Sequence, residues 1–251
     1  MNRKIAESLS AKLESPDQSF ETPFKLRIVD AFLPKSWLDR IASSFPSWEA
    51  DAWEHSEIGE VERKKRSTWD SVYDVPEGAR DVVELLNSSI FLRALSCSLD
   101  IPKLIPDPYF TGGGLNISGE GDYLDVHVDG NYHDASGLNR RVNAILYLNP
   151  VWDRTWGGNF GMYSEDGSTL VREFSPKNNR LLIFDTSDSS FHGYPEPIQC
   201  PPDIKRKSLI LYYYTKDAQS CETVRVPQPH SALWVKRGMR DKHFKKTRSF
   251  T

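Results

Sequence analysis

The stretch Tyr123-Leu124-Asp125-Val126-His127-Val128-Asp129 alternates apolar and polar side chains along most of its length. Because successive side chains of a β-strand point to opposite faces, Leu124, Val126 and Val128 would share one face, and His127 and Asp129 the other. Such a strand directs an imidazole and a carboxylate toward one point. A His-x-Asp pair alone also fits a hydrogen-bonded surface pair, so the surrounding sequence has to decide between these interpretations.

The surrounding sequence predicts a β-rich core. From about residue 105, short apolar runs recur at intervals of roughly ten residues, with Gly, Pro, Asn and Asp between them. These runs are 109–111, 115–117, 123–128, 142–148, 159–163, 170–174, 181–184 and 208–214. Regularly spaced short strands separated by turns indicate a β-sandwich or barrel. The predicted fold class is therefore mostly β with packed helices.

The part before residue 105 carries mainly helical signals. Residues 1–20 predict a short amphipathic helix and a loop, and residues 25–29 a strand. A helix should open at 34–36, and residues 75–99 predict one or two helices. Residues 47–74 show no clear periodicity. Since no Pro/Gly/Ser-rich linker interrupts the chain, we expect one domain over 1–251, with a helix-rich part (1–104), a β core (105–215) and a C-terminal extension (216–251).

The composition is that of a soluble globular chain. Its 251 residues are 38% hydrophobic and 27% charged, and the net charge of -3 argues against bulk attraction to nucleic acid. Between Lys236 and Arg248 lie seven Lys or Arg and one Asp. A basic tail of this kind is usually a solvated end, and an anionic partner is the alternative.

The chain shows no sign of export or of a membrane segment. Cys97, Cys200 and Cys221 are far apart without a C-x-x-C, which favours a reducing compartment over a disulfide framework. The N-terminus lacks the apolar core of a signal peptide, and no stretch approaches the ~18 apolar residues that span a bilayer. We therefore expect a cytoplasmic location and no membrane partner.

A third candidate ligand is His192, in Ser190-Phe191-His192-Gly193. Two histidines and one carboxylate can close one face of an octahedron and leave the other face open. Non-haem ferrous oxygenases hold iron in this way. Taken alone, His192 has a plainer structural interpretation.

Arg206 supplies the next constraint, because it opens the strand-like run that continues through Lys207 and Ser208 to Tyr214. A buried Arg needs an anionic partner, and its planar fork matches a carboxylate. A dicarboxylate that chelates iron at one end and pairs with Arg206 at the other would satisfy this need. Ser208, on the same face, would add a hydrogen bond.

Residues 105–215 resemble the catalytic domain of the Fe(II)- and 2-oxoglutarate-dependent dioxygenases, specifically their prolyl 4-hydroxylase-like branch. The matching stretches surround the His-x-Asp pair and recur in the same order as in that family. They are Gly121-Asp122-Tyr123-Leu124, Ala144-Ile145-Leu146-Tyr147-Leu148-Asn149, Trp156-Gly157-Gly158-Asn159-Phe160, Phe191-His192-Gly193 and Arg206-Lys207-Ser208. The resemblance implies a double-stranded β-helix, or jelly roll, with iron at one mouth.

The resemblance also implies roles for individual residues. His127, Asp129 and His192 match the catalytic iron ligands, and Arg206 matches the residue that binds the far carboxylate of 2-oxoglutarate. Tyr147 matches a position whose hydroxyl assists that carboxylate. Glycines at 157–158 would leave the site unobstructed, whereas residue 159 is Asn where the family commonly has an acidic residue.

The implied reaction hydroxylates an unactivated C–H bond, consumes O2 and 2-oxoglutarate, and releases succinate and CO2. The carboxylate ligand favours hydroxylation over halogenation. The substrate stays open between a prolyl or other amino-acid residue in a protein or peptide and a small molecule. Asn131, Arg141 and Trp156 are the candidate substrate contacts.

Two alternatives remain. One is a non-catalytic jelly-roll module that binds a ligand. The other is a nucleic-acid dealkylase, suggested by the basic tail and by Arg63-Lys64-Lys65-Arg66. Dealkylases of this superfamily carry an Arg-x-Asn-x-Thr run after the distal His, which this chain lacks, so nucleic acid is the less favoured partner.

Overall fold

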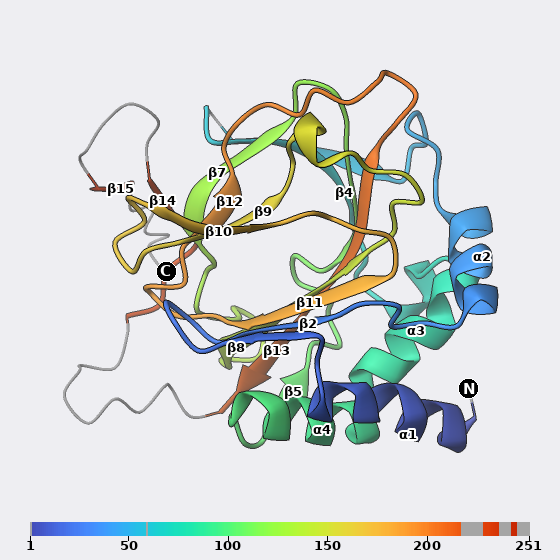
Figure 1. The fold of residues 1–251 in the computed structure, drawn as a ribbon. Helices are drawn as coiled ribbons and strands as arrows, with labels where there is room; N and C mark the ends of the chain where they lie inside the picture. The colour runs from blue at the N-terminus through green and yellow to red at the C-terminus, as the bar shows by residue number, and fades with distance from the viewer. Residues whose placement is uncertain (1, 59, 217–227, 236–241, 245–251) are drawn as a thin grey trace.

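The computed structural model describes residues 2–58, 60–216, 228–235 and 242–244, the last of these for the backbone only. Its centre is a set of antiparallel strands in the second half of the chain (Figure 1). They are β6 (Gly114–Ser118), β7 (Tyr123–Val128), β8 (Asn139–Tyr147), β9 (Phe160–Tyr163), β10 (Leu170–Phe174), β11 (Arg180–Asp185), β12 (His192–Tyr194) and β13 (Arg206–Thr215).

These strands form two facing layers. One layer has the order β11-β8-β13-β6, and the other has the order β7-β12-β9-β10. Apart from the hairpin β9–β10, consecutive strands alternate between the layers, which is the connectivity of a double-stranded β-helix. The predicted fold class is therefore confirmed.

Four strands of the N-terminal part extend this framework. They are β1 (Gln18–Phe20), β2 (Leu26–Val29), β3 (Trp53–Ile58) and β4 (Glu62–Ser67). β2 pairs with β11 and carries β1 at its outer side, whereas β4 pairs with both β6 and β7 and so joins the two layers. A short strand, β5 (Ile105–Pro106), pairs with the end of β13.

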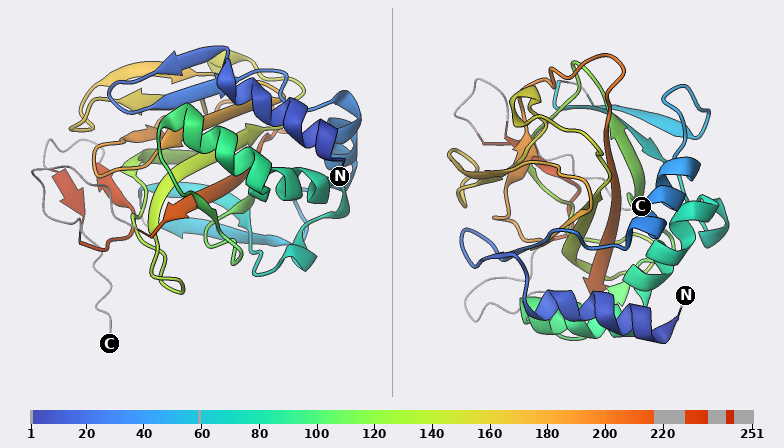
Figure 2. Two further views of the ribbon diagram at one scale, coloured as in Figure 1. Left: turned by 90° about the horizontal axis from the view of Figure 1, so that it is seen from below. Right: turned by 45° about the vertical axis from the view of Figure 1, so that its right-hand side comes forward.

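Helices cover the outer face of the β11-β8-β13-β6 layer. They are α1 (Arg3–Ala11), α2 (Lys35–Ser44), α3 (Glu77–Asn87) and α4 (Ser89–Leu99), with 3-10 turns at Lys12–Glu14, Val72–Asp74 and Arg154–Trp156. α1 and α4 lie side by side across the sheet (Figure 2). The Ser88 side chain accepts a hydrogen bond from the Phe91 backbone N–H and so caps α4.

The two faces of this layer bury different sets of apolar side chains. Leu209, Leu211 and Tyr213 of β13 face the helices and belong to the larger core. The opposite face points between the layers, where Tyr147, Phe160 and Phe184 form a second cluster. Because alternate residues of one strand serve both clusters, β13 reads as a continuous run of aliphatic and aromatic residues over 209–214.

Three predictions about individual elements were wrong or incomplete. Residues 109–111 form a turn instead of a strand, because the Asp107 carboxylate accepts the backbone N–H groups of Tyr109 and Thr111 and Phe110 has φ of 52°. The hairpin β3–β4 and the strand β12 were not predicted. β4 reads Glu-Arg-Lys-Lys-Arg-Ser, so it shows no apolar alternation.

The C-terminal extension contributes β14 (Leu233–Val235), which pairs with β7, and β15 (Lys242–Phe244), which pairs with β14. The rest of the basic tail and Cys221 lie outside the described residues; Cys97 and Cys200 are free thiols. No single described helix is long and apolar enough to span a bilayer. α3 and α4 reach that composition only as a pair bent by 55°.

Candidate active site

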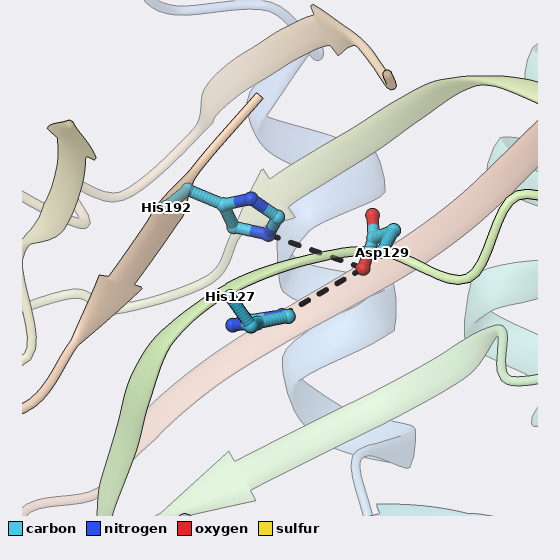
Figure 3. Close-up of side chains that lie close together, drawn as sticks. All are labelled: His127, Asp129 and His192. Atoms are coloured by element: carbon cyan, nitrogen blue, oxygen red, sulfur yellow. Dashed lines mark ion pairs between the residues drawn. The ribbon is translucent and has the colours of Figure 1, made fainter. Parts of the chain in front are cut away.

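His127, Asp129 and His192 converge between the layers (Figure 3). β7 carries His127 and ends just before Asp129, and the antiparallel register of β12 places His192 opposite His127. Their ligand atoms all lie within 4.8 Å of one another. Asp129 Oδ1 is 3.7 Å from His127 Nε2 and 4.0 Å from His192 Nε2.

Both imidazoles are oriented by the backbone. Nδ1 of His127 lies 2.8 Å from the Asp125 carbonyl, and Nδ1 of His192 lies 3.0 Å from the Ser190 carbonyl. A carbonyl oxygen only accepts hydrogen bonds, so each Nδ1 donates its proton. The Nε2 lone pairs are thereby left for a metal ion, the arrangement that second hydrogen bonds of metal-ligating histidines usually impose.

Aromatic rings hold the two imidazoles in place. Trp234 stacks on His127 with ring centroids 4.6 Å apart, and Phe184 meets the His192 ring at the same separation, edge to face. Phe160 stacks on His192 at 5.4 Å.

The carboxylate of Asp129 is held by a neighbouring amide. Asn143 Nδ2 donates to Asp129 Oδ2 at 3.0 Å, which leaves Oδ1 facing the imidazoles. Burial opposes ionisation of Asp129, but His127, His192 and Arg140 together hold the pKa of its carboxyl well below the usual range. Burial and the adjacent His127 lower the pKa of His192 to about 4. At neutral pH the site therefore presents a carboxylate and a neutral His192, the protonation states that bind metals.

A cavity of about 520 Å³ extends from these residues to Arg206. Arg206 is 7% exposed, and its Nε donates to the Gly158 carbonyl at 2.7 Å. Its Nη2 donates to the Tyr147 hydroxyl at 3.3 Å, and its guanidinium lies 4.5 Å from the centre of the Tyr194 ring. Gly158 has φ of +63°, and a Cβ there would lie 3.0 Å from Arg206 Cδ, so this position requires glycine.

The far end of the cavity fits a carboxylate. No carboxylate among the described residues lies within ion-pair distance of Arg206, although a buried guanidinium needs one. The hydroxyl of Ser208 faces the same cavity, is fully buried and has no hydrogen-bond partner among the residues that the structure describes. Together with the two-histidine, one-carboxylate set at the other end, this arrangement fits ferrous iron and a dicarboxylate such as 2-oxoglutarate.

The candidate substrate contacts lie elsewhere. Asn131 binds the C-terminal segment, since its Nδ2 donates to the Gln228 carbonyl and its Oδ1 accepts the His230 N–H. Trp156 packs edge to face on Trp152. Neither residue lines the cavity, nor does Arg141, so a substrate role for them stays an untested prediction.

Arg140, the neighbour of Arg141, does line the cavity. Its guanidinium lies 3.9 Å from the centre of the Tyr212 ring and donates to the Tyr214 hydroxyl. The register of β8 against β13 shifts between Tyr213 and Tyr214. Simple alternation along β8 would turn Arg141 toward the cavity, but the register shift turns Arg140 there instead. No feature of the sequence signals this shift.

Several cavity residues were missed. Glu62 and Lys64 come from β4, Trp234 from β14, and Asn143 from the same strand as Tyr147. Asn143 and Tyr147 are four residues apart, and alternation along a strand would have placed both on the inner face. β4 and β14 offered no comparable signal.

The sequence comparisons agree with this geometry. The family model described as "2OG-Fe(II) oxygenase superfamily" matches residues 113–214. A mouse (Mus musculus) protein, prolyl 3-hydroxylase OGFOD1, is 30% identical over 115 residues, and its Xenopus laevis counterpart is 35% identical over 68 residues. These matches cover 41% and 26% of this chain but only 21% and 13% of the relatives, so the chain spans a small part of their length.

Solved structures share the fold. A Pseudomonas putida prolyl-4-hydroxylase has a TM-score of 0.57 and 16% identity, with 85% of this chain and 100% of that chain covered. A Trichoplax adhaerens prolyl hydroxylase in complex with a peptide fragment of the hypoxia inducible factor oxygen degradation domain has a TM-score of 0.53 and 14% identity. That comparison covers 84% of this chain and 89% of the other. Identities this low show a common architecture only.

Proposed function

We propose that this chain, whose residues 113–214 match the model of the 2OG-Fe(II) oxygenase superfamily, is an Fe(II)- and 2-oxoglutarate-dependent hydroxylase. One observation carries the proposal. A single cavity holds a two-histidine, one-carboxylate set at one end and, at the other, a buried arginine with no carboxylate partner among the described residues. A site that only bound a ligand would not need both a set of metal ligands and a buried arginine in one cavity.

In this proposal, His127, Asp129 and His192 hold ferrous iron. The metal supplies the activation of O2 and, with 2-oxoglutarate, the oxidising power that hydroxylates a C–H bond while succinate and CO2 leave. Arg206 pairs with the far carboxylate of 2-oxoglutarate, and Tyr147 and Ser208 add hydrogen bonds to it.

The remaining cavity residues orient the site and exclude water. Asn143 fixes Asp129 so that one carboxylate oxygen is available to the metal. Ile145, Ile210 and Phe160 line the wall between the ends, where apolar side chains exclude water from the cosubstrate.

We further propose a prolyl residue of a peptide or protein as the substrate. The mouse relative is named a prolyl 3-hydroxylase, and the Trichoplax structure holds a peptide. In this chain, Tyr132, Tyr212, Pro229 and Trp234 line the cavity beyond the proposed metal ligands, and a pyrrolidine ring packs well on such surfaces.

The first test is succinate release from 2-oxoglutarate in air, with and without ferrous iron. We expect His127→Ala and Asp129→Ala to lower turnover by more than about 100-fold, because loss even of a residue that only orients a ligand typically costs 10- to 100-fold. His55→Ala, at an exposed histidine of β3, serves as the control and should match the parent. Equal turnover by all the proteins would disprove the ligand assignment, and no turnover with any peptide or small molecule would favour the binding module.

A further inference from the structure

β4 brings two further cations, Lys64 and Arg66, into the cavity from outside the segment that matches the family. Its residues Glu62, Lys64 and Arg66 alternate along the strand and all line the cavity. Arg63 does not line it, and the Lys65 ammonium lies over the Trp48 ring on the other side of the strand. The run 63–66 is therefore not one basic patch, because the strand separates its charges between two faces.

Strand register places Lys64 in the same row as Arg206. β4 pairs with β6 through Lys65↔Ile117 and Arg66↔Asn116, so the next inward residue, Lys64, is level with Ser118. Ser118 in turn pairs with Arg206 of β13. Adjacent strands are about 4.8 Å apart, so the Cα atoms of Lys64 and Arg206 lie about 10 Å apart across Ser118. All three side chains line the same cavity.

Glu62 holds Lys64 in its position. Lys64 Nζ lies 2.9 Å from Glu62 Oε2, and the other oxygen of Glu62 accepts a hydrogen bond from the Ser56 hydroxyl of β3. The Lys64 and Glu62 side chains are 18% and 8% exposed. Burial alone disfavours both charges, but their mutual attraction raises the pKa of Lys64 and, with the Ser56 hydrogen bond, lowers the pKa of Glu62.

An ion pair is not needed to keep the hairpin β3–β4 together. The hairpin already has a continuous backbone register from Trp53↔Ser67 to Ile58↔Glu62. A buried ion pair is also often no more stabilising than apolar residues of the same size. Only one N–H of the Lys64 ammonium is needed for Glu62, so the group has further donors to offer.

We propose that Lys64 is a second cationic anchor for 2-oxoglutarate, held by Glu62 so that its ammonium donates to the cosubstrate across the cavity from Arg206. The inference rests on the proposed function. It assigns a cosubstrate contact to the N-terminal part of the chain, outside residues 113–214. Because Glu62 neutralises Lys64, the ammonium offers the dianion further hydrogen-bond donors without adding net charge to the cavity.

The test measures the binding of 2-oxoglutarate to the Mn(II)-loaded protein by titration calorimetry, which needs no turnover. Lys64→Met should weaken binding by at least about 10-fold, the loss expected for one hydrogen bond between charged groups. Lys64→Arg should recover most of the affinity. Arg63→Met is the matched control on the same strand, since the Arg63 side chain is 57% exposed and does not line the cavity.

Because Lys64→Met leaves Glu62 buried without its cation, we expect that variant to lose stability for reasons unrelated to the ligand. The double variant Glu62→Gln/Lys64→Met removes both charges together, so it leaves no buried charge unpaired and isolates the effect on ligand binding. It should fold and bind 2-oxoglutarate about 10-fold more weakly than the parent. Glu62→Gln alone, which keeps a side-chain oxygen that can accept from the Lys64 ammonium, should weaken binding by less than the double variant. A double variant with parental affinity would show a purely structural ion pair and overturn the inference. A parent that does not bind 2-oxoglutarate would instead disprove the proposed function, and the inference with it.

Discussion

At the scale of single residues, Asn143 determines which oxygen of Asp129 is free. Its amide donates to Oδ2, and its own Oδ1 is buried in the cavity wall with no partner in the described part of the chain. Asn143→Leu would keep the volume but leave Oδ2 without its donor. We expect the affinity for Mn(II) to fall by about 10- to 100-fold, as is typical when the partner of a metal ligand is removed.

The Mn(II) affinity can be measured by electron paramagnetic resonance, which detects the free ion. Asn139→Ala is a suitable control, because Asn139 lies on the same strand but donates to the Lys216 carbonyl away from the site. Unchanged Mn(II) affinity in Asn143→Leu would mean that the backbone alone fixes Asp129.

The sequence could identify those site residues whose type and spacing are typical of metal ligands or of carboxylate binding. His127 and Asp129 share a face through simple alternation, and Arg206 opens a strand whose residues 209–214 are aliphatic or aromatic. The structure brings these three side chains into one cavity with His192. The sequence did not identify Arg140 as a cavity residue, because the register of β8 against β13 shifts beside it. It did not identify Lys64 either, because Lys64 lies in a run of charged residues that resembles a solvated surface. Such residues become visible only when strand pairing shows which way each side chain points.

At the scale of elements, the segment Gln228–Val235, here called the strap, closes one wall of the cavity. Pro229, His230 and Trp234 line it, and Leu233 and Trp234 pair with Val128 and His127. Sequence analysis predicted only an extension here, because a three-residue strand has too few positions to show alternation.

Asn131 should control how firmly the strap is held. Its side chain makes one hydrogen bond with the Gln228 carbonyl and one with the His230 N–H. Asn131→Ala removes both, at about 1 kcal/mol each, so local opening of the strap should become roughly 10-fold or more frequent. Hydrogen–deuterium exchange over 228–235 measures this opening, and the hairpin β9–β10 is the internal reference. Equal exchange in the variant and the parent would show that strand pairing and Trp234 suffice to hold the strap.

At the scale of the whole molecule, the β11-β8-β13-β6 layer separates the larger hydrophobic core from the cavity that holds the candidate active site. Leu209, Leu211 and Tyr213 of β13 face the helices, whereas Arg206 and Ser208 of the same strand face the cavity. The hydroxyl of Tyr213 donates to the Leu86 carbonyl of α3, which ties the helices to the sheet. The periodicity of the sequence predicted the strands of both layers except β12. It did not predict the hairpin β3–β4, whose strand β4 joins the layers.

This separation predicts that stability and metal binding can be changed independently. Phe91 of α4 is fully buried and meets the rings of Phe32 and Tyr213, each with centroids 6.3 Å apart. Phe91→Ala should lower the free energy of unfolding by about 3–5 kcal/mol, measured by urea denaturation. Exposed Arg93, on the same helix, is the control, since Arg93→Ala should change stability by no more than about 0.5 kcal/mol. At temperatures where Phe91→Ala stays folded, its Mn(II) affinity should equal that of the parent, because the helices contact only the outer face of the sheet. A folded variant with weakened Mn(II) binding would show that the helical layer also sets the geometry of the metal ligands.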